Sequence, residues 1–166
     1  NAFGLLGYLN REQYGDRPLG YGQYYDAKVV GQKEGAMSYT DLNGKYVATG
    51  AKIIPEYDPA RCTIFPRMYS REPNHISAYK EWSGIKGEQK PNFGNNLKYF
   101  FSYQMNFMFW RYFMWNFVGR QNDVQGHGSI LKGNWLSGIN FIDSMFLGPQ
   151  SKIPDSMKNN KARNTF

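Results

Sequence analysis

The sequence predicts an α+β fold in which a small antiparallel sheet packs against a long aromatic-rich helix, with shorter helices flanking both. Two observations lead to this class. Between about residues 24 and 66, short runs with β-type periodicity alternate with turn residues. Between about residues 95 and 118, one long aromatic run has the length and the flanking residues of a helix. Because strand and helix patterns are separated along the chain, we expect an antiparallel sheet.

The β-rich part contains the runs YYDAKVVG, AMSYT, KYVATG and KIIPEY. Residues 41–44 (DLNG) give the clearest hairpin signal, because Asn-Gly readily takes the positive φ values of a tight turn. Residues 62–65 lie between prolines at 59 and 66, so they predict only a brief strand at a sheet edge.

Three shorter helices are expected, over residues 2–14, 73–82 and 135–146. The first has Asn1 as its N-cap and Gly15 as a stop, and the second ends at Gly84. Residues 84–96 predict a polar linker, and residues 151–166 a weakly structured tail.

The long helix carries 11 aromatic residues between positions 97 and 118, with Asn95 or Asn96 as the expected N-cap and Gly119 at the C′ position. Its polar interruptions, and the near-absence of Leu, Ile and Val, favour a buried or interfacial helix over one that spans a membrane. Three interpretations stay open: a core helix, a stacking platform for carbohydrate or bases, and a membrane-interface anchor.

Length and composition predict a single domain over residues 1–166, with a β-rich part (24–66) and a helical part (95–146). The net charge of +7 attracts anions in general. Nucleic acid is not expected as a partner, because the cations lie mostly outside the aromatic segment. A single Cys and two His exclude a disulfide framework and most His/Cys metal clusters. We predict no metal site, and we also predict no cofactor.

The polar residues after the long helix are the best candidate site. We predict that a ligand contacts them together with aromatic and cationic residues of the helix, and the full set is Trp110, Arg111, Trp115, Arg120, Asn122, Asp123 and His127. Arg111, Trp115 and Gly119 are four residues apart, so one helix face leads into the polar cluster. The alternative is structural: Asp123 pairs with one of these arginines and fixes the helix end to the core.

Catalytic residues cannot be assigned from these patterns. A metal at Asp123 and His127 lacks a further ligand at a recognisable spacing. Ser129, His127 and Asp123 lie too close in sequence to form a nucleophilic triad, and no strand-turn-helix elbow surrounds the serine.

Several runs resemble one uncharacterised family of large polytopic membrane proteins of Bacteroidetes, which is similar to protein O-mannosyltransferases. The runs are FGLLGYLNREQYGDRPLGYG, GKYVATG, IFPRMYS, YFFSYQMNFMFWRYFMWNFVGRQNDVQGHG, GNWLSGINFID and PDSMKNNKARNTF. In such proteins the corresponding stretch resembles a loop domain on the extracytoplasmic (periplasmic) side of the inner membrane. The resemblance implies that the tail over residues 151–166 leads to a membrane helix.

The resemblance implies a membrane-embedded glycosyltransferase-like protein that transfers sugar from a polyprenyl-phosphate donor to a protein or glycan acceptor. The membrane helices of the same polypeptide would then be partners of this domain. No residue here matches the acid that activates the acceptor in the transferases, so the resemblance transfers no catalytic residue. The alternative function is a noncatalytic glycan- or peptide-binding module of a surface-export or cell-envelope apparatus.

Overall fold

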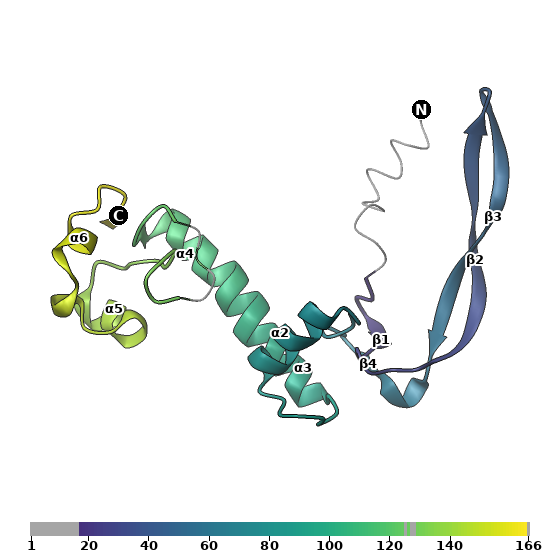
Figure 1. The fold of residues 1–166 in the computed structure, drawn as a ribbon, viewed down its shortest axis with the longest axis horizontal. Coiled ribbons are helices and arrows are strands. Elements are labelled where there is room, and N and C mark those ends of the chain that lie inside the picture. The colour runs from purple at the N-terminus through teal and green to yellow at the C-terminus, as the bar shows by residue number, and fades with distance from the viewer. Residues whose placement is uncertain (1–16, 125, 127–128, 166) are drawn as a thin grey trace. The chain divides into compact units, whose positions relative to one another are not determined.

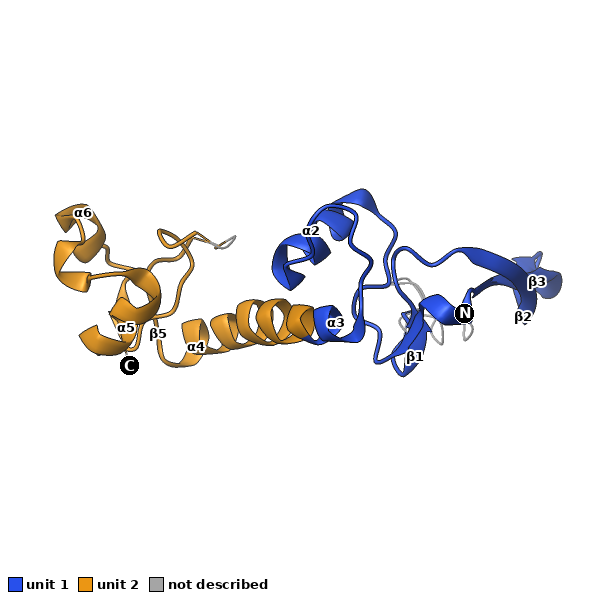
Figure 2. Cartoon of the chain, turned by 90° about the horizontal axis from the view of Figure 1, so that it is seen from below, with its two compact units in different colours: residues 1–97 blue, residues 98–166 orange. Residues whose placement is uncertain are grey.

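The computed structural model describes residues 17–124, 126 and 129–165, and it confirms the mixed α+β class (Figure 1). The helix expected over residues 2–14, with its caps Asn1 and Gly15, lies outside the described residues. The chain divides into two compact units, residues 1–97 and residues 98–166 (Figure 2). Each unit is described below by itself.

The strands of the first unit form two separate antiparallel pairs. β1 (Tyr21–Gln23) pairs with β4 (Cys62–Ile64), which confirms the brief strand expected there. β2 (Val29–Leu42) and β3 (Lys45–Tyr57) form a long hairpin. Its turn residues Asn43 and Gly44 have φ values of 54° and 78°, as a two-residue hairpin loop requires, so the predicted hairpin is also confirmed.

Helix α2 (Pro73–Ser83) contributes two buried residues to this unit, Tyr79 and Ser83. It ends at Gly84, whose φ of 75° places it in the left-handed region, as predicted. Tyr25 stacks on Tyr79 with 5.9 Å between ring centroids, and burial raises the pKa of both phenols. The short 3-10 helix η2 (Pro59–Arg61) leads into β4.

The long helix begins earlier than predicted, with α3 (Phe93–Tyr99). Asn92 and Asn95 cap it reciprocally: the Oδ1 of Asn92 accepts from the Asn95 N–H at 2.9 Å, and the Oδ1 of Asn95 accepts from the Asn92 N–H at 3.3 Å. The prediction that Asn95 or Asn96 is the N-cap is therefore wrong. Asn96 is instead fully buried, where its amide accepts from the Arg67 N–H and donates to the Phe65 carbonyl, both at 2.8 Å.

The helix then continues without a break through the π-helical segment η3 (Phe100–Trp110) into α4 (Arg111–Phe117), which confirms the long aromatic helix. Within the ranges described, no helix is long and apolar enough to cross a membrane. Gly119 follows the C-cap Val118 but does not adopt the left-handed conformation expected of a C′ glycine. Glycine is required at this position for another reason: a Cβ there would lie 2.6 Å from the carbonyl oxygen of Leu136.

The rest of the second unit consists of short elements. β5 (Gly119–Arg120) pairs with β6 (Asn164–Thr165), so the expected weakly structured tail contributes a strand as well as the 3-10 helix η4 (Gln150–Lys152) and α6 (Asp155–Lys158). α5 (Asn140–Leu147) is shorter than the predicted helix over 135–146. The reason is that Trp135 forms a β-bridge with Arg120.

Candidate functional site

One face of the long helix forms a continuous line of side chains that ends at the polar loop. We call this line the inner stripe, and its members are spaced four residues apart: Tyr99, Tyr103, Phe107, Arg111 and Trp115. Consecutive rings from Tyr99 to Phe107 stack at 5.2 and 5.8 Å, and the Arg111 guanidinium lies 4.5 Å from the Phe107 ring centre. The inner stripe is at least half-buried along its length.

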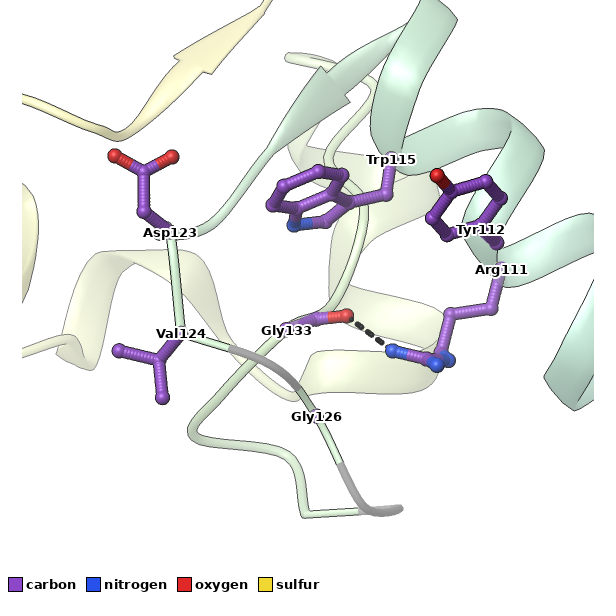
Figure 3. A pocket seen from close by; sticks show the side chains of 7 residues that line it. All are labelled: Arg111, Tyr112, Trp115, Asp123, Val124, Gly126 and Gly133. Atoms are coloured by element: carbon purple, nitrogen blue, oxygen red, sulfur yellow. Dashed lines mark hydrogen bonds between the residues drawn. The ribbon is translucent and has the colours of Figure 1, made fainter.

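Arg111 joins the inner stripe to the loop. Its Nε donates to the Phe107 carbonyl at 3.0 Å, and its Nη1 donates to the Gly133 carbonyl at 2.8 Å (Figure 3). Within the described part of the chain these bonds use two of the five guanidinium N–H donors. The remaining donors are the ones with which the side chain can bind an anion.

Asn122 organises the loop opposite the helix. Its Oδ1 accepts from the backbone N–H groups of Val124 and Gly133, at 3.2 and 3.0 Å, while its Nδ2 donates to the Leu131 carbonyl at 3.1 Å. Its backbone carbonyl accepts from the Trp115 indole N–H at 3.2 Å. Asn122 thus shapes the loop through its amide, and its contact with a ligand stays a prediction.

Two glycines allow the loop to fold back on itself. Gly133 has a φ of 67°, and a Cβ there would lie 2.5 Å from the Cα of Gly126 and 2.8 Å from the Val124 carbonyl oxygen. A Cβ on Gly126 would lie 2.5 Å from the Lys132 carbonyl oxygen. Only glycine fits at such a close approach of two backbones.

The helix and the loop together enclose a pocket of about 180 Å³ (Figure 3). Its lining residues are Arg111, Tyr112 and Trp115 from α4, and Asp123, Val124, Gly126 and Gly133 from the loop. This volume is below the roughly 300–1,000 Å³ of a site for a drug-sized ligand, so the pocket suits a group about as large as one monosaccharide or phosphate.

Arg120 lies beside the pocket. Its Nη1 is 2.9 Å from the Oδ1 of Asp123, and its guanidinium lies 5.3 Å from the Trp115 ring centre. The Asp123 side chain is 61% exposed, however. The ion pair that the structural alternative anticipated does form, but it is open to solvent, so its carboxylate is accessible to a ligand.

The structure therefore brings Arg111, Trp115 and Asp123 together around one pocket, with Arg120 and Asn122 next to it. Trp110 does not line the pocket; its ring contacts Phe109 and Phe113 and is about half-exposed. His127 lies outside the described residues.

Sequence reasoning missed four lining residues: Tyr112, Val124, Gly126 and Gly133. A signal existed for the glycines, because residues 119–134 are glycine-rich, but glycine content alone does not tell which two backbones meet. Across the described ranges, no cluster of three His, Cys, Asp or Glu side chains could hold a metal ion.

The chain belongs to a family of unknown function, DUF8416, whose sequence profile matches residues 15–101, more than half of the chain. No curated protein and no solved structure matches it. The matched range ends before Arg111, so the pocket lies outside it.

Proposed function

We propose that this member of a family of unknown function is the extracytoplasmic part of a membrane-embedded glycosyltransferase-like protein, and that its pocket binds the sugar-phosphate end of a polyprenyl-phosphate sugar. One observation carries the proposal: Arg111, Trp115 and Asp123 surround a single pocket of about 180 Å³.

Each of these side chains has a chemical counterpart in such a ligand. The flat rings of Trp115 and Tyr112 offer apolar surface to one face of a sugar. The exposed carboxylate of Asp123 accepts hydrogen bonds from sugar hydroxyls. The Arg111 donors that the Phe107 and Gly133 carbonyls do not use bind a phosphate oxygen. The pocket is too small for a prenyl chain, which would remain outside it.

The wider context of the proposal comes from the sequence resemblance described above. It implies a location at the periplasmic face of the inner membrane, the membrane helices of the same polypeptide as partners, and a protein or glycan as acceptor. The role assigned to this chain is binding, because Asp123, the one acid among the described lining residues, already pairs with Arg120. The acid that activates the acceptor would lie elsewhere in the protein.

A fluorescence titration tests the proposal. A water-soluble short-chain prenyl-phosphate mannose should saturably change the tryptophan emission of the chain, because Trp115 lines the pocket. Asp123→Asn should weaken binding about tenfold, the loss expected for charge-assisted hydrogen bonds to hydroxyls. Asp155→Asn is the matched control, since Asp155 also forms an exposed i,i+3 ion pair, at 3.6 Å from Lys158.

Two further probes separate the parts of the ligand. Prenyl phosphate without sugar should bind more weakly and should not distinguish Asp123→Asn from the unmodified chain. Arg111→Lys should weaken every phosphate-bearing probe. Equal affinity of the Asp123→Asn and Asp155→Asn chains for the complete probe would contradict the proposal.

A second candidate function is a noncatalytic glycan- or peptide-binding module of a cell-envelope apparatus. It is favoured by the exposure of Tyr112 and Asp123, which both line the pocket. These two side chains can contact a neutral ligand that carries no phosphate. In that case free oligosaccharide or peptide would bind as tightly as the prenyl-phosphate probe, and Arg111→Lys would have little effect.

A further inference from the structure

The long helix carries a second group of aromatic side chains, on a face other than that of the inner stripe. We call this group the outer aromatic cluster: Phe109, Trp110, Phe113 and Phe117. Their rings form a chain of contacts, with centroid distances of 6.1 Å between Phe109 and Phe113, 5.8 Å between Trp110 and Phe113, and 4.9 Å between Phe113 and Phe117.

The outer aromatic cluster faces away from the pocket. Phe109, Phe113 and Phe117 are each offset by two residues from a member of the inner stripe, which in a helix is a rotation of about 200°. All four rings of the cluster are exposed, Phe117 by 68%.

A contiguous apolar patch of this kind requires an explanation that single exposed residues do not. Each square ångström of apolar surface left in water costs about 25 cal/mol, and contiguous patches on soluble proteins usually mark a binding surface. The remaining question is which partner the patch fits.

Charge points to an anionic partner. Residues 98–166 contain eight Lys and Arg against three Asp and no Glu, a net charge of +5, and Asp143 among these acids is buried. Helix residues 93–117 contain no acid at all. An anionic surface can therefore approach this face without meeting a carboxylate of the helix.

The residue types point to a lipid surface. The helix combines Phe, Trp and Tyr with Ser102, Gln104, Asn106 and Asn116, and it contains almost no Leu, Ile or Val. Aromatic rings beside polar groups suit the headgroup level of a bilayer, whereas its hydrocarbon centre favours aliphatic side chains.

We propose that the outer aromatic cluster binds the surface of an anionic lipid bilayer, with the helix lying in the interface plane. This inference goes beyond ligand binding in the pocket and does not require it, because it concerns a different face of the helix. Lys98, on the same helix, is exposed and would add electrostatic attraction to the headgroups.

Depth-dependent quenching tests the proposal on two tryptophans of the same helix. One chain keeps Trp110 as its only tryptophan and a second keeps Trp115, with the others replaced by Phe. Vesicles of phosphatidylcholine and phosphatidylglycerol that contain a brominated lipid should quench Trp110 several-fold more than Trp115. Equal quenching of the two residues in bound chains would overturn the proposal.

Substitution provides a second test that leaves every tryptophan in place. Phe113→Ser combined with Phe117→Ser should lower partitioning to these vesicles at least tenfold. Tyr39→Ser combined with Leu42→Ser, at exposed positions of the β2–β3 hairpin, should leave it unchanged. Added salt and omission of phosphatidylglycerol should both weaken binding.

Two results would overturn the proposal: unchanged vesicle binding by the Phe113/Phe117 variant, or a dimer in sedimentation that this variant abolishes, which would make a second copy of the chain the occupant. The vesicles contain no sugar-phosphate lipid. Failure here is therefore distinguishable from failure of the pocket to bind its ligand, and Asp123→Asn should not affect vesicle binding.

Discussion

The inner stripe and the outer aromatic cluster share one helix and one kind of residue, but their surroundings differ. The inner stripe is at least half-buried and ends under a loop whose backbone accepts hydrogen bonds from Arg111 and Trp115. The outer aromatic cluster consists of exposed rings that contact one another. Residue type alone therefore does not separate the pocket face from the other; the loop over residues 119–134 does.

The difference between these two faces predicts that substitutions along the inner stripe and its loop destabilise the second unit. Substitutions of the same kind in the outer aromatic cluster should have only a small effect on its stability. The following predictions concern the free energy of unfolding, measured by urea denaturation and far-UV circular dichroism.

The largest effect is expected for Gly133→Ala. The alanine would take a positive φ, and its Cβ would press on the backbone of Gly126, so we expect a loss of about 3 kcal/mol. Gly87→Ala is the control, because Gly87 has a φ of 58° with open space around it and should lose only about 1 kcal/mol. Similar losses at both positions would contradict the close approach that forms the pocket.

Trp115→Ala and Trp110→Ala test the comparison directly. Trp115 is partly buried, donates to the Asn122 carbonyl and stacks with Arg120, so its loss should cost about 2 kcal/mol. Trp110 is about half-exposed and should cost less than about 1 kcal/mol. A larger cost at Trp110 would mean that the outer aromatic cluster is part of the packed core.

Arg111→Lys should cost about 1 to 2 kcal/mol. Lysine keeps the charge but cannot donate to the Phe107 and Gly133 carbonyls in the same fixed geometry, and it loses the stacking on Phe107. In a double-mutant cycle, Arg111→Lys and Phe107→Leu together should lose less free energy of unfolding than the sum of their separate losses. The difference is the coupling between the two residues. Strictly additive losses would indicate that the stacking contributes nothing.

Asp123→Asn should have the smallest effect on stability, below about 1 kcal/mol, because its ion pair with Arg120 is exposed to solvent. A buried pair would instead lose about 3 to 5 kcal/mol. A loss of that size would show that Asp123 acts by holding the loop to the helix and would remove it from the ligand site.

Local features of the fold could be predicted from the sequence because they depend on residues close together in the chain. The hairpin turn at Asn43 and Gly44 and the helix end at Gly84 follow from the φ values that these residues tolerate. The line from Arg111 through Trp115 toward the polar loop follows from helical spacing alone.

Tertiary structure decided what depends on residues distant in the chain. Asn96 is of a residue type that often caps helices, but its buried side chain hydrogen-bonds to the backbone of Phe65 and Arg67. Asn92 caps the helix instead. The sequence predicts Gly119 as a helix stop. Glycine is instead required there because a Cβ would collide with the backbone oxygens of Leu136 and Asn164. The sequence shows where a side chain can point, but the free energy of its burial or exposure depends on the segments that pack against it. For that reason the sequence alone determined that this helix is aromatic and leads to a polar loop, and only the tertiary structure decided which of its faces closes a pocket.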